Sequence, residues 1–166
     1  MGEIVMSEKE GWELEKEQTA KVKKAEEYFE NGFCCAQAVF TTFATDYGIP
    51  EEMALRITTQ FSGGARKGEM CGSVVGALMA LGLKYGFSDG TAQGEREMAH
   101  KKSVEFMDRF IEKKGTVVCK ELLGYDISRP GELERIRALG LFQSVCPSMV
   151  RCAAEIVEQM LKEAEV

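Results

Sequence analysis

Apolar and polar positions follow one another along this chain with the spacing of amphipathic helices. In the charge-rich segment 7–31, Val22, Ala25 and Phe29 are three and four positions apart, which places them on one helix face. No segment shows the period-two alternation of a half-buried strand. The same spacing predicts helices over residues 33–47, 51–61, 69–86, 91–114, 116–123 and 144–163, with one or two helical turns in 132–139.

This pattern predicts an all-α fold, a single compact bundle of about six helices around a central apolar helix. The segment 69–86 is apolar on nearly all sides and is the expected central helix, while Asn31 is the expected N-cap of the helix over 33–47. Gly68, Gly72 and Gly76 recur every four residues and leave a smooth groove in which another backbone can approach closely. The groove would serve a neighbouring helix or, equally, a second copy of the chain in a homodimer.

Length and charge narrow the class of protein. With 166 residues, 45% of them hydrophobic, the chain suits one domain over 1–166, in which residues 1–24 form a charged N-terminal helical arm. A net charge of −6 argues against a nucleic-acid partner, which requires a basic face. The start of the chain lacks the basic and then apolar stretches of a secretory signal, and the most apolar run, 70–83, is too short to cross a membrane. We therefore expect a cytoplasmic protein without membrane insertion.

Cysteine is the residue type in which to look for chemistry, because the chain has six cysteines and one histidine. A reducing cytoplasm argues against three structural disulfides. Four predicted helix starts carry cysteine, and the unpaired N–H groups and partial positive charge of a helix start stabilise a thiolate, which is both a nucleophile and a metal ligand. Spacing alone leaves open whether these starts converge in space. The cysteines at the four starts are Cys34 with Cys35, Cys71, Cys119 and Cys146.

Cys152 and the adjacent pair Cys34 and Cys35 are interpreted separately. Cys152 lies on the stripe formed with Met149 and Ile156 in a helix interior, so we expect a small core residue. Adjacent helical side chains point about 100° apart. Cys35 leans toward the apolar face and is the favoured functional residue of the pair, with Cys34 as the alternative.

The glycine-rich turn before the central helix carries two basic residues. Arg66 and Lys67 are candidates for lowering the pKa of the Cys71 thiol. An anion cradle at this turn is an alternative that we rank below a tight turn with solvated basic residues, because such composition is common in turns. The P-loop pattern GxxxxGK[ST] is absent.

Several segments together resemble a known family. They are Phe33-Cys-Cys-Ala-Gln-Ala-Val39, Cys71-Gly-Ser-Val-Val-Gly76, Cys119-Lys-Glu-Leu-Leu-Gly124 and Cys146 with its downstream residues. Over roughly residues 25–160 the chain is similar to the C_GCAxxG_C_C family of redox-active proteins, which is marked by four cysteines. The resemblance implies that Cys35, Cys71, Cys119 and Cys146 are these four, and Ser73 stands where the family usually has Ala.

Three functions stay open at this point. The first is a four-thiolate metal or iron–sulfur site that passes electrons to an unknown partner, since thiolates suit iron–sulfur clusters and zinc. A further resemblance to part of the split-Soret cytochromes implies an iron–sulfur centre, and the lack of CxxCH excludes covalent c-type haem. The second is a thiol–disulfide protein without metal, with Cys71 as the catalytic redox nucleophile. The third is a non-catalytic helical interaction module whose cysteines lie in the core.

Overall fold

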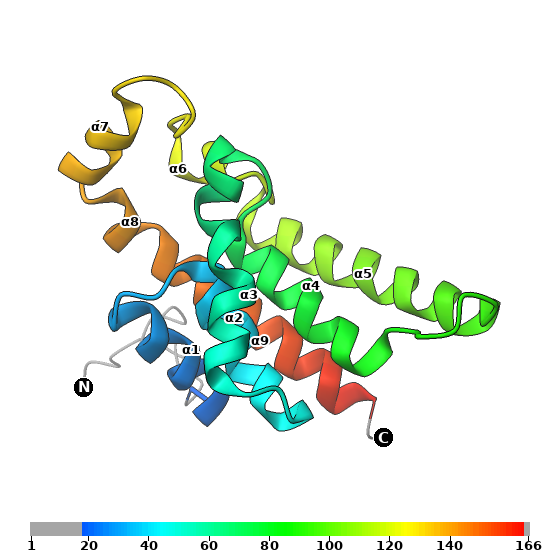
Figure 1. The fold of residues 1–166 in the computed structure, drawn as a ribbon. Coiled ribbons are helices and arrows are strands. Elements are labelled where there is room, and N and C mark those ends of the chain that lie inside the picture. Colours follow the sequence, from blue (N-terminus) through cyan, green and yellow to red (C-terminus); the bar gives the residue numbers. More distant parts are fainter. Residues whose placement is uncertain (1–17, 165–166) are drawn as a thin grey trace, which may run out of the picture.

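The computed structural model describes residues 18–164, which form an assembly of helices (Figure 1). The prediction of an all-α fold is confirmed, since the described residues contain no strand and only one isolated antiparallel bridge, between Met70 and Val118. Much of the predicted arm over 1–24 lies outside the described residues. The helices are α1 (Ala20–Glu30), α2 (Cys35–Ala44), η1 (Thr45–Tyr47), α3 (Glu51–Thr58), η2 (Thr59–Phe61), η3 (Gly64–Gly68), α4 (Gly72–Tyr85), α5 (Gln93–Lys114), α6 (Cys119–Leu123), α7 (Glu132–Ala138), α8 (Leu141–Ser144) and α9 (Cys146–Glu163).

The main core forms where α2 packs against α4, with α1, α3, α5 and α9 around this pair. In α2 every residue except Gln37 is buried. In α4, which the sequence indicated as the central helix, Gly82 and Lys84 are exposed. The second half of α4 packs against α5 and α9, with the Tyr85 hydroxyl donating to the carbonyl oxygen of Met160, and its remaining side is open to solvent (Figure 1). The described residues therefore have α2, rather than α4, as their most completely buried helix.

The predicted glycine groove is filled by the same chain, by α2 at Gly72 and Gly76 and by Lys120 of α6 at Gly68. A Cβ atom at Gly76 would lie 2.6 Å from the carbonyl oxygen of Ala36, and one at Gly72 would lie 2.5 Å from Sγ of Cys35. Only the missing side chains allow this approach. Because the groove is already occupied, a second copy of the chain cannot bind in it. The groove therefore no longer supports the predicted homodimer.

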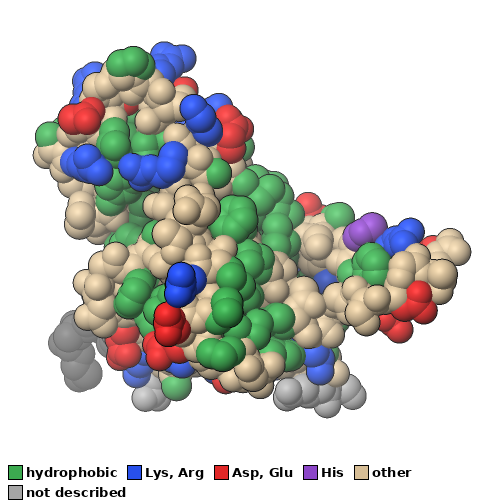
Figure 2. All heavy atoms as spheres, viewed as in Figure 1, with side chains coloured by type: hydrophobic (Ala, Val, Ile, Leu, Met, Phe, Trp, Pro, Cys, Tyr) green, Lys and Arg blue, Asp and Glu red, His purple; other side chains and the backbone are tan. Residues whose placement is uncertain are grey.

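A smaller core lies under α6, α7 and α8. Its buried residues are Cys119, Leu123, Ile127 and Ile136, and Cys146 packs against them. These helices form a lobe at the upper left of Figures 1 and 2, where several Lys and Arg side chains gather. The chain thus has two hydrophobic clusters within one fold, and the contact between them is where the thiols lie.

Several helix boundaries differ from the sequence prediction, and two of these differences concern the cysteines. Asn31 is the C-cap of α1, and its N–H donates to the carbonyl oxygen of Glu27, so the predicted role as N-cap of α2 was wrong. Cys34 takes the N-cap position, and its N–H donates to the Gln37 side-chain oxygen at 2.9 Å. The predicted helix 144–163 begins at Cys146, after the separate short helix α8. Within residues 18–164, no helix combines the length and the apolar character needed to span a bilayer.

Candidate functional site: a pocket of thiols

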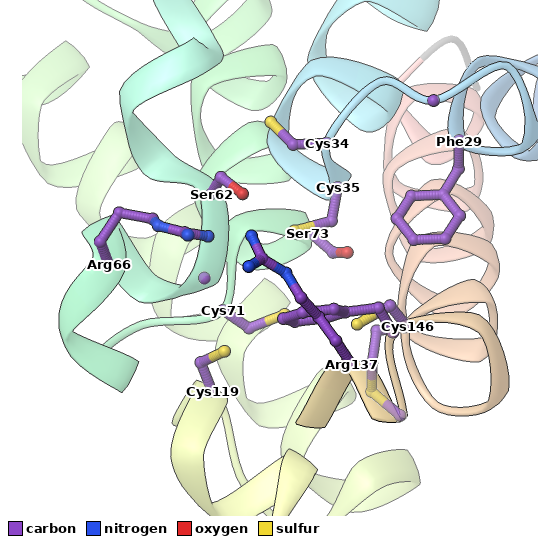
Figure 3. Close-up of a pocket in the computed structure, with 14 residues that line it drawn as sticks. Phe29, Cys34, Cys35, Ser62, Arg66, Cys71, Ser73, Cys119, Arg137 and Cys146 are labelled. Atoms are coloured by element: carbon purple, nitrogen blue, oxygen red, sulfur yellow. The ribbon is translucent and has the colours of Figure 1, made fainter. Parts of the chain in front are cut away.

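Five cysteines line one pocket of about 260 Å³ between the two hydrophobic clusters (Figure 3). The predicted placement at four helix starts is confirmed, because each of these thiols lies at an N-cap or a first helical residue. Cys152 is buried inside α9 within the main core and does not line the pocket, as expected of a packing residue. The five lining cysteines are Cys34, Cys35, Cys71, Cys119 and Cys146.

A short backbone pairing brings Cys71 and Cys119 to the same wall. The Cys71 N–H donates to the carbonyl oxygen of Val117 at 2.8 Å, and the Cys119 N–H donates to that of Glu69 at 2.6 Å. These bonds flank the Met70–Val118 bridge and satisfy donors that would otherwise be unpaired near two helix starts. The bridge therefore fixes two thiols that are far apart in the sequence.

Cys35 and Cys71 form the electrostatically unequal pair of the pocket. A hydrogen bond from the Cys35 thiol is the largest cause that lowers the pKa of Cys71, which reaches about 7 although burial opposes the shift. The N–H groups of Ser73 and Val74, at the start of α4, lower the pKa further. The same hydrogen bond, together with burial, raises the pKa of Cys35 well above its ordinary value. Near pH 7 Cys71 is therefore about half ionised, and in its ionised form the pair consists of a thiolate and a thiol that donates to it.

Cys119 and Cys146 are neutral thiols on the lobe side of the pocket. Burial, followed by repulsion from Cys71, raises the pKa of each to about 12. The Arg66 guanidinium opposes the shift at Cys119. Negative charge is therefore concentrated on one sulfur, since each further thiolate would stand next to the first in a buried site.

Two arginines and the Ser73 hydroxyl also line the pocket. Arg66 lines it, whereas its neighbour Lys67 does not, although both residues are exposed. Arg137, from α7, lines the opposite side and was not singled out from the sequence, where nothing in its spacing connects it to the cysteines. The Ser73 hydroxyl is fully buried and has no partner of ordinary hydrogen-bond geometry among residues 18–164, although it contributes to the lowered pKa of Cys71.

The predicted metal ligands share the pocket without forming a metal-ligand set. Among the described residues, no three or more His, Cys, Asp or Glu side chains are arranged to hold a metal ion. The four sulfurs of Cys35, Cys71, Cys119 and Cys146 are distributed around the walls (Figure 3). These four thiols therefore line the pocket separately, and metal binding by them stays a prediction.

Comparison with known proteins agrees with the chemistry of this pocket. Residues 33–160 match the model of the family described as "Putative redox-active protein (C_GCAxxG_C_C)". The chain belongs to this family. The range matched to the C_GCAxxG_C_C family includes every cysteine of the pocket, and the family description supports a redox role for them. No curated protein and no solved structure matches the chain with significant similarity.

The lowered pKa of Cys71 predicts an early alkylation of this residue as the pH rises. Because only the thiolate reacts, the iodoacetamide rate at Cys71 should rise through a midpoint near pH 7 and then level off. Cys119 and Cys146 should still react slowly at pH 8, since their pKa values are about 12. Peptide mapping by mass spectrometry after brief labelling measures each site. Equal rates at the three sites would contradict the assignment of the charge to Cys71.

Proposed function

We propose that this protein is a thiol–disulfide redox protein in which Cys71 and Cys35 form the reactive pair. The observation that carries the proposal is the contact between these two thiols inside the pocket, with Cys71 as thiolate. The overall reaction transfers two electrons: two cysteine thiols and one disulfide substrate give one protein disulfide and two product thiols. Membership in a redox-active cysteine family supports the same conclusion.

The difference in pKa between Cys71 and Cys35 determines which of the two thiols reacts first. The Cys71 thiolate attacks one sulfur of the substrate disulfide, forms a mixed disulfide, and releases the first product as a thiolate that takes up a proton from water. Cys71 is then no longer charged, so the main cause of the raised pKa of Cys35 is gone. Cys35 loses its proton, attacks Sγ of Cys71, and releases the second product thiol. The neutral thiols of Cys119 and Cys146 stay outside this exchange.

Thiol counting tests the proposal. Full-length protein is reduced, freed of reductant and treated with a disulfide, and its free thiols are then counted under denaturing conditions. We expect a loss of two thiols and, on peptide mapping, a disulfide between Cys35 and Cys71. A Cys152→Ala variant serves as control and should lose the same two thiols, because Cys152 packs in the core. A different pairing, or no loss, would overturn the proposal.

A four-thiolate metal or iron–sulfur site that passes electrons to a protein partner is the second candidate. The observation that favours it is that all four family cysteines line one pocket. Anaerobic purification, followed by elemental analysis and visible absorbance on the sample used for thiol counting, tests it. Stoichiometric iron or zinc with no titratable thiol at Cys71 would favour this candidate over the thiol pair. We expect either activity in the cytoplasm, where thiols are kept reduced.

A further inference from the structure

Two exposed arginines line the thiol pocket, and neither has an anionic partner among residues 18–164. Figure 3 shows Arg66, from η3, and Arg137, from α7, extending toward one another across the pocket. Within residues 18–164 these two are the arginines whose side chains make no ion pair and no hydrogen bond. The others are each paired with a carboxylate or, for Arg96, with a carbonyl oxygen: Arg56, Arg96, Arg109, Arg129, Arg135 and Arg151.

The backbone at Arg66, which places this side chain at the pocket, is strained. Ala65 and Arg66 have φ angles of 52° and 62°, in the left-handed region that side chains other than glycine rarely adopt. Such a conformation is energetically unfavourable and is commonly found at functional sites. A strained backbone at an arginine that lines a pocket of thiols makes Arg66 a candidate to bind an anion there.

The buried hydroxyl of Ser73 is an independent observation on the same pocket. It lines the space beside Cys71, is fully buried, and has no hydrogen-bond partner of ordinary geometry within the described residues. The hydroxyl contributes to the lowered pKa of Cys71, and an acceptor atom on a bound molecule would give it a partner of ordinary geometry. The pocket volume of about 260 Å³ suits a small molecule better than a folded protein.

We propose that the pocket binds a small disulfide whose substituents carry carboxylates, and that Arg66 and Arg137 hold these carboxylates while one sulfur meets Cys71. This inference rests on the proposed thiol–disulfide function and specifies its substrate class. Planar guanidinium groups bind carboxylates through paired hydrogen bonds, which positions as well as attracts the substrate. Electrons and atoms balance as above: the substrate disulfide is reduced to two thiols while Cys35 and Cys71 become a disulfide.

Three small disulfides that differ in charge test the proposal. They are 3,3′-dithiodipropionate (anionic), 2-hydroxyethyl disulfide (neutral) and cystamine (cationic). The rate at which each oxidises the reduced full-length protein is divided by its rate with N-acetylcysteine at the same pH and salt concentration. We expect the normalised rate to favour the anionic disulfide over the neutral one by about tenfold or more, since a hydrogen bond to a charged group contributes about 1.5–3 kcal/mol.

The arginine variants separate binding from general charge. Arg66→Gln combined with Arg137→Gln should remove the preference for the anionic disulfide. Lys67→Gln, the matched control, removes the same charge one residue away from Arg66 and should retain the preference, because Lys67 does not line the pocket. Arg66→Gly is a second variant that removes the guanidinium and also relieves the left-handed backbone, so folding should be preserved.

The possible failures are distinguishable. If none of the three disulfides oxidises Cys35 and Cys71, the proposed function fails and the inference fails with it. If all three oxidise the pair with equal normalised rates, the proposed function stands and the inference is overturned. Loss of the preference in Lys67→Gln to the same extent as in the arginine variants would also overturn it, because surface charge alone would then explain the selectivity.

Discussion

Replacing Cys35 with alanine is expected to abolish the two-thiol change on oxidation and to raise the pKa of Cys71. The variant removes the partner sulfur of the disulfide, and it also removes the hydrogen bond that is the largest cause of the lowered pKa. Alkylation of Cys71, with its midpoint near pH 7 in the unmodified protein, should then require a higher pH. Thiol counting and the pH profile of iodoacetamide labelling measure the two effects.

The neighbouring cysteine provides the matched control. Cys34→Ala changes the adjacent residue, which lines the same pocket but makes no contact that shifts the pKa of Cys71. We expect it to keep both the two-thiol change and the midpoint near pH 7. Cys35→Ser restores a hydrogen-bond donor without a sulfur, so it should lose the disulfide while shifting the midpoint less than Cys35→Ala. An equal loss of the disulfide in Cys34→Ala would contradict the assignment of the pair.

Replacing Gly76 with alanine is expected to destabilise the protein by about 1–3 kcal/mol or more, the usual cost of overpacking. The new Cβ would lie 2.6 Å from the carbonyl oxygen of Ala36 and 3.2 Å from the amide nitrogen of Phe40. Both atoms belong to the backbone of α2, which is buried on nearly all sides and has no room to retreat. Thermal unfolding should show a decrease in Tm of several degrees, since 1 kcal/mol corresponds to roughly 2–4 °C at this chain length.

Gly82 in the same helix provides the opposite expectation. It is exposed, and a Cβ atom there would meet nothing within 4 Å. Gly82→Ala should therefore stabilise the protein by about 0.5–1 kcal/mol through helix propensity alone. If the two substitutions shifted Tm in the same direction, the close approach of α4 to α2 at Gly76 would be refuted.

The sequence predicted those parts of the molecule that depend on local spacing. Helical periodicity located most helices, and the cysteines at helix starts followed from the same map because a helix start is a local property. The recurrence of Gly72 and Gly76 indicated a close backbone approach, but the partner was a matter of tertiary packing and proved to be α2. Asn31 was read as an N-cap because the residue type suits both helix ends, and it caps the end of α1 instead.

The parts of the site that were missed depend on packing between distant segments. Arg137 reaches the pocket only because α7 is packed in the lobe, which no short-range pattern reports. The left-handed backbone at Arg66 was equally hidden, because left-handed geometry is expected at glycine and rarely at arginine. The burial of the Ser73 hydroxyl beside Cys71 could be recognised only from the folded structure. The cysteines at helix starts could thus be predicted from the sequence, whereas the positions of Arg137 and Ser73 in the pocket could not.

The buried hydrophobic residues form two clusters of different size, and the pocket thiols are divided between them. Cys35 and Cys71 belong to the large cluster of the body, whereas Cys119 and Cys146 belong to or pack on the small cluster under α6–α8. A cooperative unit with so few buried residues opens at a lower free energy than the whole domain. We therefore expect sub-global unfolding of the lobe to open the lobe side of the pocket, while the reactive pair stays folded in the body. Solvent access to Cys71 would then depend on the stability of the lobe as well as on global unfolding.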